Sequence, residues 1–211
     1  MNIFNIFSLI VLLFSAVIHE LSHGFVANRL GDPTARYMGR LTLNPLKHID
    51  MFGTIILPLI LFISRAPFIF GYAKPIVINP YNLKNQKRDM AIVGLSGPLS
   101  NIGIALLFSI ILQVLPVDSG LGVVGIFFAI IVQINITLAV FNLIPIPPFD
   151  GSRLVMFFLP ITGQRFYNRL ESQPILSLMI GVFIFYYLIS PLIMNPLMSV
   201  GLGSWYPVFF Q

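Results

Sequence analysis

The chain has 211 residues, of which 57% are hydrophobic and only 9% are charged. A soluble globular domain carries charges on roughly a quarter of its residues. The composition therefore excludes a soluble domain and indicates a membrane protein. The formal net charge is +5, which in a membrane protein reports the orientation of loops, so we expect a surrounding lipid bilayer and no nucleic-acid partner. There is no Cys, which excludes disulfide bonds, thiolate metal sites and a Cys nucleophile, so any metal ion has to be held by His and carboxylate side chains.

Four stretches without Asp, Glu, Lys or Arg are long enough to cross a bilayer, which takes about 20 apolar residues. The first is interpreted as a retained span rather than a secretory signal, because it lacks a basic n-region and a small-residue cleavage site. We therefore expect an all-α polytopic membrane protein, built as a single membrane-embedded domain over residues 1–211. The expected spanning helices cover about residues 3–27, 90–115, 121–147 and 175–197.

The region between the first two spans has a mixed character. Residues 51–64 are uncharged but only 14 in number, a length typical of a re-entrant or interfacial segment. Short alternating runs at residues 40–43 and 75–78 predict strands at the membrane surface.

The basic residues predict which side of the membrane each loop faces, because Lys and Arg near span ends favour the cytoplasm. If the N-terminus lies outside and residues 51–64 do not cross, all twelve Lys and Arg are cytoplasmic. If that segment did cross, Lys74, Lys84 and several others would lie outside. The four-span topology is therefore preferred.

The end of the first span carries an HExxH motif, His19-Glu20-Leu21-Ser22-His23. Because a helix has 3.6 residues per turn, the two His lie one turn apart on one face, where a single zinc ion can reach both. Glu20 lies beside that face, in the position of a metalloprotease general base. A chance match or a polar contact between helices is the alternative, but ionisable residues near the membrane interior are costly and usually functional.

A catalytic zinc takes three protein ligands and keeps an open position, so a third ligand is expected. A rise of 1.5 Å per residue places His19 about 24 Å along the first span, in its cytoplasmic part. Asp150 follows the third span on the same side, after prolines that break the helix. Asp150 could instead cap the next helix or begin a turn with Gly151, and His48 is the other candidate ligand. We prefer Asp150, because His48 beside Lys47 fits a loop or surface position.

Other side chains suggest structural roles. Gly97, Pro98 and Asn101 in the second span are expected to serve close packing of helices. Trp205 and Tyr206 are expected to be aromatic anchors at the outer membrane interface.

The segments HELSHG, at residues 19–24, and NLIPIPPFDG, at residues 142–151, resemble the site-2 protease family of intramembrane zinc metalloproteases. Three further segments, RLTLNPLKHID, GYAKP and GPLSN, are similar to the compact bacterial branch of that family, which has no PDZ domain. The resemblance covers most of residues 15–155.

The resemblance implies one Zn²⁺ per chain, held by His19, His23 and Asp150, with Glu20 as general base and acid. It implies that Asn142 hydrogen-bonds the substrate or the developing oxyanion. Substrates are then single-span membrane proteins or remnant signal peptides, cut within or near their transmembrane segments in regulated intramembrane proteolysis or signal-peptide clearance. The location implied is a bacterial cytoplasmic membrane, crossed several times, with the active site toward the cytoplasm. Nothing in the sequence indicates an oligomeric state.

The alternative function is a divalent-metal transporter, because His and Glu on a membrane helix also line ion pathways. A transporter typically places polar, ionisable residues along several spans and often has an inverted repeat. The second and third spans carry amides, and no repeat is apparent, so the protease is preferred.

Overall fold

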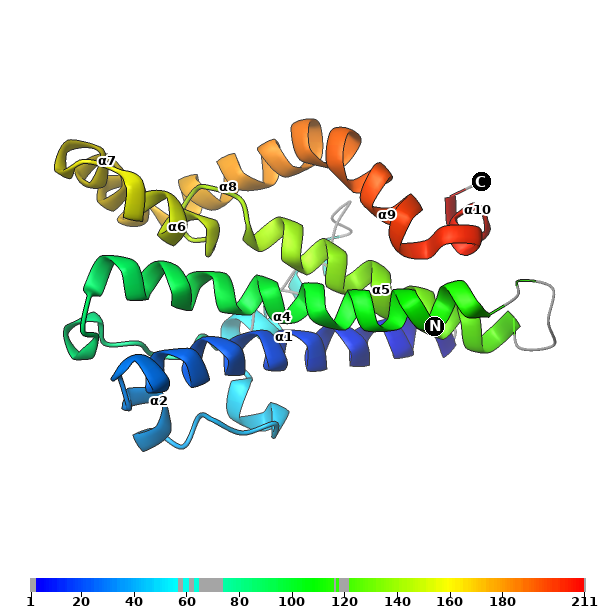
Figure 1. Cartoon of the computed structure of the whole chain (residues 1–211), viewed down its shortest axis with the longest axis horizontal. Helices are drawn as coiled ribbons and strands as arrows, with labels where there is room; N and C mark the ends of the chain where they lie inside the picture. Colours follow the sequence, from blue (N-terminus) through cyan, green and yellow to red (C-terminus); the bar gives the residue numbers. More distant parts are fainter. Residues whose placement is uncertain are drawn as a thin grey trace.

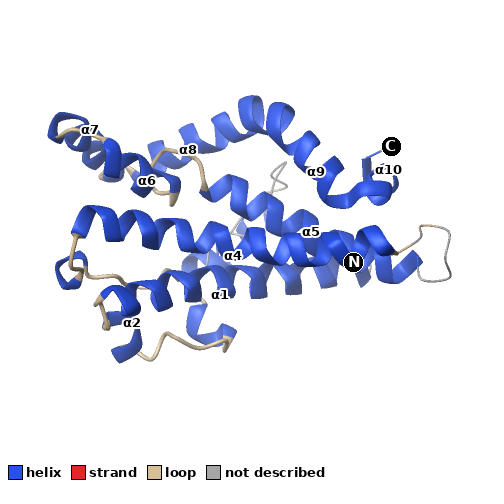
Figure 2. Ribbon diagram, in the orientation of Figure 1, coloured by secondary structure: helices blue, strands red, loops and turns tan. Residues whose placement is uncertain are grey.

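The structure is a computed structural model that describes residues 3–56, 59–60, 63–64, 74–115, 117 and 122–210. Over these residues the secondary structure is helical, with no strand (Figure 2). The strands predicted at residues 40–43 and 75–78 are therefore not confirmed. A physical reason is visible in the second run, where the backbone N–H groups of Ile76 and Asn79 donate to the carboxylates of Glu20 and Asp32 rather than to another strand.

Three long helices form the centre of the molecule: α1 (Ile3–Leu30), α4 (Gln86–Val114) and α5 (Gly122–Asn142). Helix α4 packs against both α1 and α5, and the three run side by side in Figure 1. Each is long and apolar enough to cross a membrane. Helices therefore occur where the first three spans were predicted, except that α5 ends five residues before the predicted residue 147, because the prolines that follow cannot continue a helix.

The fourth candidate span covers Pro174–Phe209. It is made of α8 (Pro174–Ile184), a π-helical stretch (Phe185–Met194), α9 (Asn195–Leu202), a short 3₁₀ turn and α10 (Tyr206–Phe210). Figure 1 shows these helices arching over α5 and rejoining the bundle at α9.

The C-terminal end is fixed by Trp205, which is 1% exposed and packs in a core cluster with residues of α4, α5 and α9. Its Nε1–H donates to the Leu115 carbonyl at 3.0 Å. A Cβ at Gly125 would lie 2.0 Å from the indole ring, so the missing side chain opens the slot that the ring fills. The predicted interfacial role of Trp205 is therefore wrong, since the ring is buried in protein.

Two short helices, α6 (Gly151–Phe158) and α7 (Ile161–Glu171), connect the loop after α5 to α8. The segment predicted to be re-entrant or interfacial, residues 51–64, begins with a π-helical turn (Met51–Ile56), and part of it lies outside the described residues. Whether it crosses the membrane therefore stays a prediction.

The chain after α1 is tied back to that helix by Asp32, which is fully buried between α1 and the short helix α2 (Thr34–Tyr37). Its carboxylate accepts hydrogen bonds from Thr34, from the Asn79 N–H at 2.7 Å and from Asn82 Nδ2 at 2.8 Å. Burial would raise the pKa of Asp32, but these hydrogen bonds hold it below its ordinary value. Asp32 thus fixes the segment that leads from Ile76 to α4 beside the HExxH helix.

Candidate metal centre

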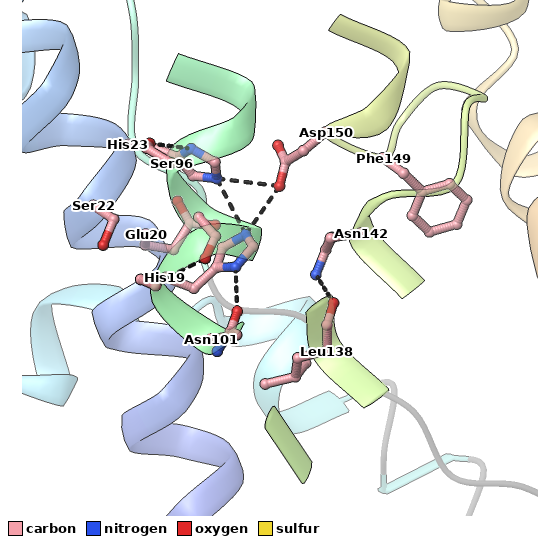
Figure 3. A network of polar contacts seen from close by, with 12 residues as sticks. His19, Glu20, Ser22, His23, Ser96, Asn101, Leu138, Asn142, Phe149 and Asp150 are labelled. Carbon is pink, nitrogen blue, oxygen red and sulfur yellow. Dashed lines mark hydrogen bonds and ion pairs between the residues drawn. The ribbon is translucent and has the colours of Figure 1, made fainter. Parts of the chain in front are cut away.

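Three side chains from distant parts of the sequence meet at one point (Figure 3). His19 and His23 come from α1, one turn apart, and Asp150 stands immediately before α6. The distance between His19 Nε2 and His23 Nε2 is 3.1 Å, and Asp150 Oδ2 lies 3.0 Å from the first and 3.2 Å from the second. Among the described residues these three form the group of His and carboxylate side chains close enough to hold a metal ion.

The spacing of the three atoms fits zinc. Tetrahedral zinc has bonds of about 2.0–2.1 Å to nitrogen and oxygen ligands, which gives ligand-to-ligand edges of about 3.3–3.4 Å. The observed triangle has sides of 3.0–3.2 Å, so a small outward shift of the three atoms is all that separates it from a coordination face. Among the described residues the group holds three His and carboxylate side chains, which is the number of protein ligands typical of a catalytic zinc site.

The other ring nitrogens also favour a cation. His19 Nδ1 lies 2.6 Å from the side-chain oxygen of Asn101, and His23 Nδ1 lies 2.7 Å from the carbonyl oxygen of Val93. Both partners are acceptors, so both rings carry their proton on Nδ1 and present an Nε2 lone pair to the centre. With both rings neutral, two lone pairs and the Asp150 carboxylate face one another, and a divalent cation removes this repulsion as an alternative to a proton.

The loop after α5 aims Asp150 at the histidines. Phe149 is buried and packs edge-on against Phe141, with ring centroids 4.7 Å apart. A Cβ at Gly151 would lie 2.2 Å from the Leu143 carbonyl oxygen, so only Gly fits the tight turn. Asp150 occupies the cap position of α6 but makes no capping hydrogen bond, which decides against the predicted alternative of a helix cap.

The ionised state of Asp150 is favoured by the histidines. Burial raises its pKa, but the hydrogen bonds and charges that His19 and His23 supply when both nitrogens of each ring are protonated outweigh this effect and lower the pKa to about 2. The carboxylate is therefore ready to bind a cation at neutral pH.

Glu20 is half-buried beside the metal face, and its Oε2 accepts a hydrogen bond from the Ile76 N–H at 2.8 Å. Asn142 is the last residue of α5, and its Nδ2 donates to the Leu138 carbonyl of the same helix at 3.0 Å. Figure 3 draws Asn142 on the Asp150 side of the site, with its amide turned to Leu138 rather than to the histidines. The roles of Glu20 and Asn142 stay predictions.

His48 is not part of this group. It is 1% exposed, and its Nε2 lies 2.9 Å from the Thr42 carbonyl oxygen. The predicted loop or surface position is wrong about the exposure, because His48 ends a short 3₁₀ helix (Pro45–His48) with its ring buried against the Thr42 carbonyl.

Gly97 and Asn101, for which the sequence predicts close packing of helices, also lie next to the site. Asn101 contacts His19 directly, and a Cβ at Gly97 would lie 2.5 Å from His23 Nε2 and 2.6 Å from His19 Cε1. The spacing of Gly97 and Asn101 in the sequence could have indicated their place beside the histidines. Gly97 and Asn101 are four residues apart on α4, as His19 and His23 are on α1, so each pair shares one helix face.

Comparison with known proteins relates most of the chain to one family. The model of the family described as Peptidase family M50 matches residues 7–125 and 118–188. The chain is 35% identical over 206 residues to "Putative zinc metalloprotease YwhC" of Bacillus subtilis (strain 168), covering 92% of this chain and 87% of that protein. It is 31% identical over 173 residues to "Putative zinc metalloprotease MJ0611" of Methanocaldococcus jannaschii, covering 77% of this chain and 80% of that protein.

A third relative is longer. The chain is 32% identical over 139 residues to "Putative zinc metalloprotease Rip2" of Mycolicibacterium smegmatis, covering 66% of this chain and 52% of that protein. No solved structure matches the chain significantly.

Proposed function

Because the chain belongs to peptidase family M50, the site-2 protease family, we propose that it is an intramembrane zinc endopeptidase that cuts proteins within or near their transmembrane segments. The observation that carries the proposal is that Asp150 meets His19 and His23, at 3.0–3.2 Å, where these two histidines lie on a helix apolar enough to cross a membrane. The divalent-metal transporter has no support from the family or from the names of the relatives.

The metal is one zinc ion per chain, held by His19 Nε2, His23 Nε2 and one oxygen of Asp150. When bound, zinc supplies Lewis-acid chemistry: it polarises the scissile carbonyl and acidifies water. The described residues contain no second group of this kind, which supports a single ion per chain.

Glu20 is the proton carrier of the proposed mechanism. Its carboxylate takes the proton from the attacking water and delivers it to the leaving amine. Glu20 is not counted as a metal ligand, because its Oε2 accepts a hydrogen bond from the Ile76 N–H. Asn142 turns its amide from Leu138 toward the developing oxyanion and donates a hydrogen bond there, which requires only a side-chain rotation at the end of α5.

The substrate has to unwind, because a helical span hides its carbonyls in hydrogen bonds from residue i to residue i+4. The extended segment of residues 74–79 passes Glu20 and is irregular rather than paired in a sheet within the described part of the chain. We propose that an unwound substrate pairs with this segment by β-augmentation. Single-span membrane proteins and remnant signal peptides are the substrates that this mode fits.

We place the site on the cytoplasmic side of a bacterial cytoplasmic membrane, because all twelve Lys and Arg then share that side. The chain has no Cys of its own, so single Cys probes test this topology. Tyr81 is 85% exposed, and a Tyr81→Cys variant labelled by an impermeant reagent from outside intact cells would overturn the placement.

The activity is tested by co-expression with a panel of tagged single-span proteins and signal peptides. Cells with the wild-type chain should accumulate products cut within the span, and cells with Glu20→Gln should not. Identical products from both chains would refute the proposal.

A further inference from the structure

A line of buried polar side chains crosses the bundle and ends at the metal centre. His19 Nδ1 donates to Asn101 Oδ1 at 2.6 Å, Asn101 Nδ2 donates to Asn135 Oδ1 at 2.9 Å, and Asn135 Nδ2 donates to Ser15 Oγ at 3.0 Å. These groups lie on α1, α4 and α5. Both amides are 0% exposed, and Ser15 and His19 are 4% and 7% exposed.

Such a line is costly unless each member is satisfied, because an unpaired amide in an apolar interior costs several kcal/mol in the least favourable media. The helices could pack with small apolar residues instead, as neighbouring buried positions of α4 and α5 do with Ala105, Ala129 and Ala139. Two Asn side chains at the crossing of three apolar helices therefore call for a role besides packing.

Each of the two Asn amides in this line can adopt only one orientation. Asn135 Nδ2 is held by Ser15 Oγ and by the Ile131 carbonyl at 2.9 Å, so Asn135 has to turn its oxygen to Asn101. Asn101 then has to turn its nitrogen to Asn135 and its oxygen to His19. A flipped Asn101 would bring two oxygens together at one end of its amide, so the network settles the orientation.

We propose that Asn101, locked by Asn135, is the positioning residue for His19. It holds the imidazole ring in one orientation with the N–H on Nδ1, and so presents the Nε2 lone pair to the metal. His23 obtains the same restraint from a backbone carbonyl, that of Val93. His19 is thus the ring whose orientation depends on a replaceable side chain.

This inference rests on the zinc site of the proposed function, and zinc affinity tests it without any substrate. The full-length protein is purified in detergent, and its zinc dissociation constant is measured by competition with a chromophoric chelator. Asn101→Leu keeps the approximate size of the side chain but removes the acceptor, and should weaken zinc binding about 10- to 100-fold. Asn101→Asp keeps an acceptor oxygen toward His19, and its other oxygen, protonated because the site is buried, can still donate to Asn135 Oδ1. This variant should bind zinc within about threefold of wild type, since carboxylate is a common partner of zinc-bound histidine.

A matched control lies on the same helix. Ser109 is also buried in α4, and its Oγ donates to the Gly201 carbonyl at 2.6 Å, in the packing of the C-terminal segment. Ser109→Ala should lower the thermal midpoint of the zinc-free protein, as Asn101→Leu does, without changing zinc affinity. If Asn101→Leu does not fold, Asn135→Ala serves in its place, because it frees Asn101 to flip and should weaken zinc binding in the same direction.

Three results would overturn the inference: wild-type zinc affinity in Asn101→Leu, equal losses in Asn101→Leu and Asn101→Asp, or a similar loss in Ser109→Ala. Each of them would leave Asn101 as a packing residue. Failure of the proposed metal site looks different, because zinc would then remain bound after His19→Ala.

Discussion

The Ile76 N–H donates a hydrogen bond of 2.8 Å to Glu20 Oε2, and this contact joins residues that are 56 positions apart in the sequence. It fixes one carboxylate oxygen of Glu20 beside the metal face. The segment that carries Ile76 is in turn held by Asp32, which accepts from the Asn79 N–H. The orientation of the proposed general base is therefore set by the chain between α1 and α4 rather than by the HExxH helix alone.

Glu20→Gln should keep zinc and lose proteolysis. The Gln side-chain oxygen can still accept from the Ile76 N–H, so the local structure is preserved, but an amide cannot carry the proton. We expect cleavage of a reporter substrate to fall by at least about 100-fold, the lower part of the usual range for general acid–base catalysis, with unchanged zinc content by elemental analysis. Residual cleavage within tenfold of wild type would count against the role of Glu20.

Two single substitutions test whether Asp150 or His48 is the third zinc ligand. Asp150→Asn should weaken zinc binding and stop proteolysis, because the amide is a much poorer ligand and cannot offset the charge of the ion. His48→Ala should leave zinc bound, because His48 contacts the Thr42 carbonyl and not the metal group. It should cost about 1–3 kcal/mol of stability, since it empties a buried position and leaves that carbonyl without its partner.

The zinc content of both purified variants is measured by elemental analysis, and the stability of His48→Ala is measured by thermal unfolding. Loss of zinc in His48→Ala together with retention in Asp150→Asn would show that the ligand set is three histidines.

Asp32 predicts a pH dependence of stability. Its pKa is lower in the folded chain than the ordinary 3.8, so its contribution is present above the unfolded-state pKa of about 3.9 and is lost as pH falls through the folded-state value. Asp32→Asn should therefore be less stable than wild type at pH 7, by about 1–3 kcal/mol, and the difference should shrink below about pH 4.

Unfolding of both proteins in the same detergent across this pH range tests the prediction. Glu171→Gln is the control, because the ion pair with Arg153 is partly exposed and such pairs contribute at most about 1 kcal/mol. A stability difference for Asp32→Asn that does not change between pH 7 and pH 3 would contradict the assignment.

The long helices and the two histidines follow from local patterns. A charge-free run of about 20 residues has few alternatives to a span, and His19 and His23 share a face because helical geometry requires it. Asp150 could be predicted because only a few carboxylates exist and the span order leaves it at the right depth.

Contacts between segments far apart in the chain could not be derived in this way. The burial of Trp205 depends on the absent side chain of Gly125, and the burial of His48 depends on the path of its own loop. Residues 75–78 alternate like a strand, but their backbone donors go to side chains of α1 and the turn after it. In each case a tertiary contact overrides the local preference.

Gly97 offers the sharpest steric test of the metal centre. A methyl group there would lie 2.5 Å from His23 Nε2 and 2.6 Å from His19 Cε1, well inside contact distance. The rings cannot retreat without breaking the hydrogen bonds from His19 to Asn101 and from His23 to the Val93 carbonyl. We therefore expect Gly97→Ala to weaken zinc binding by at least about tenfold, comparable to the loss of a ligand-orienting contact.

Gly103, six residues further along α4, is the matched control, because a Cβ there meets nothing within 4 Å. Gly103→Ala should keep wild-type zinc affinity and be neutral or more stable by about 0.5–1 kcal/mol, since Ala is the better helix former. Chelator competition on the two variants side by side separates a steric effect on the rings from a general effect of Ala in this helix. Equal zinc affinity in Gly97→Ala and Gly103→Ala would mean that the histidine rings do not occupy the positions described for them.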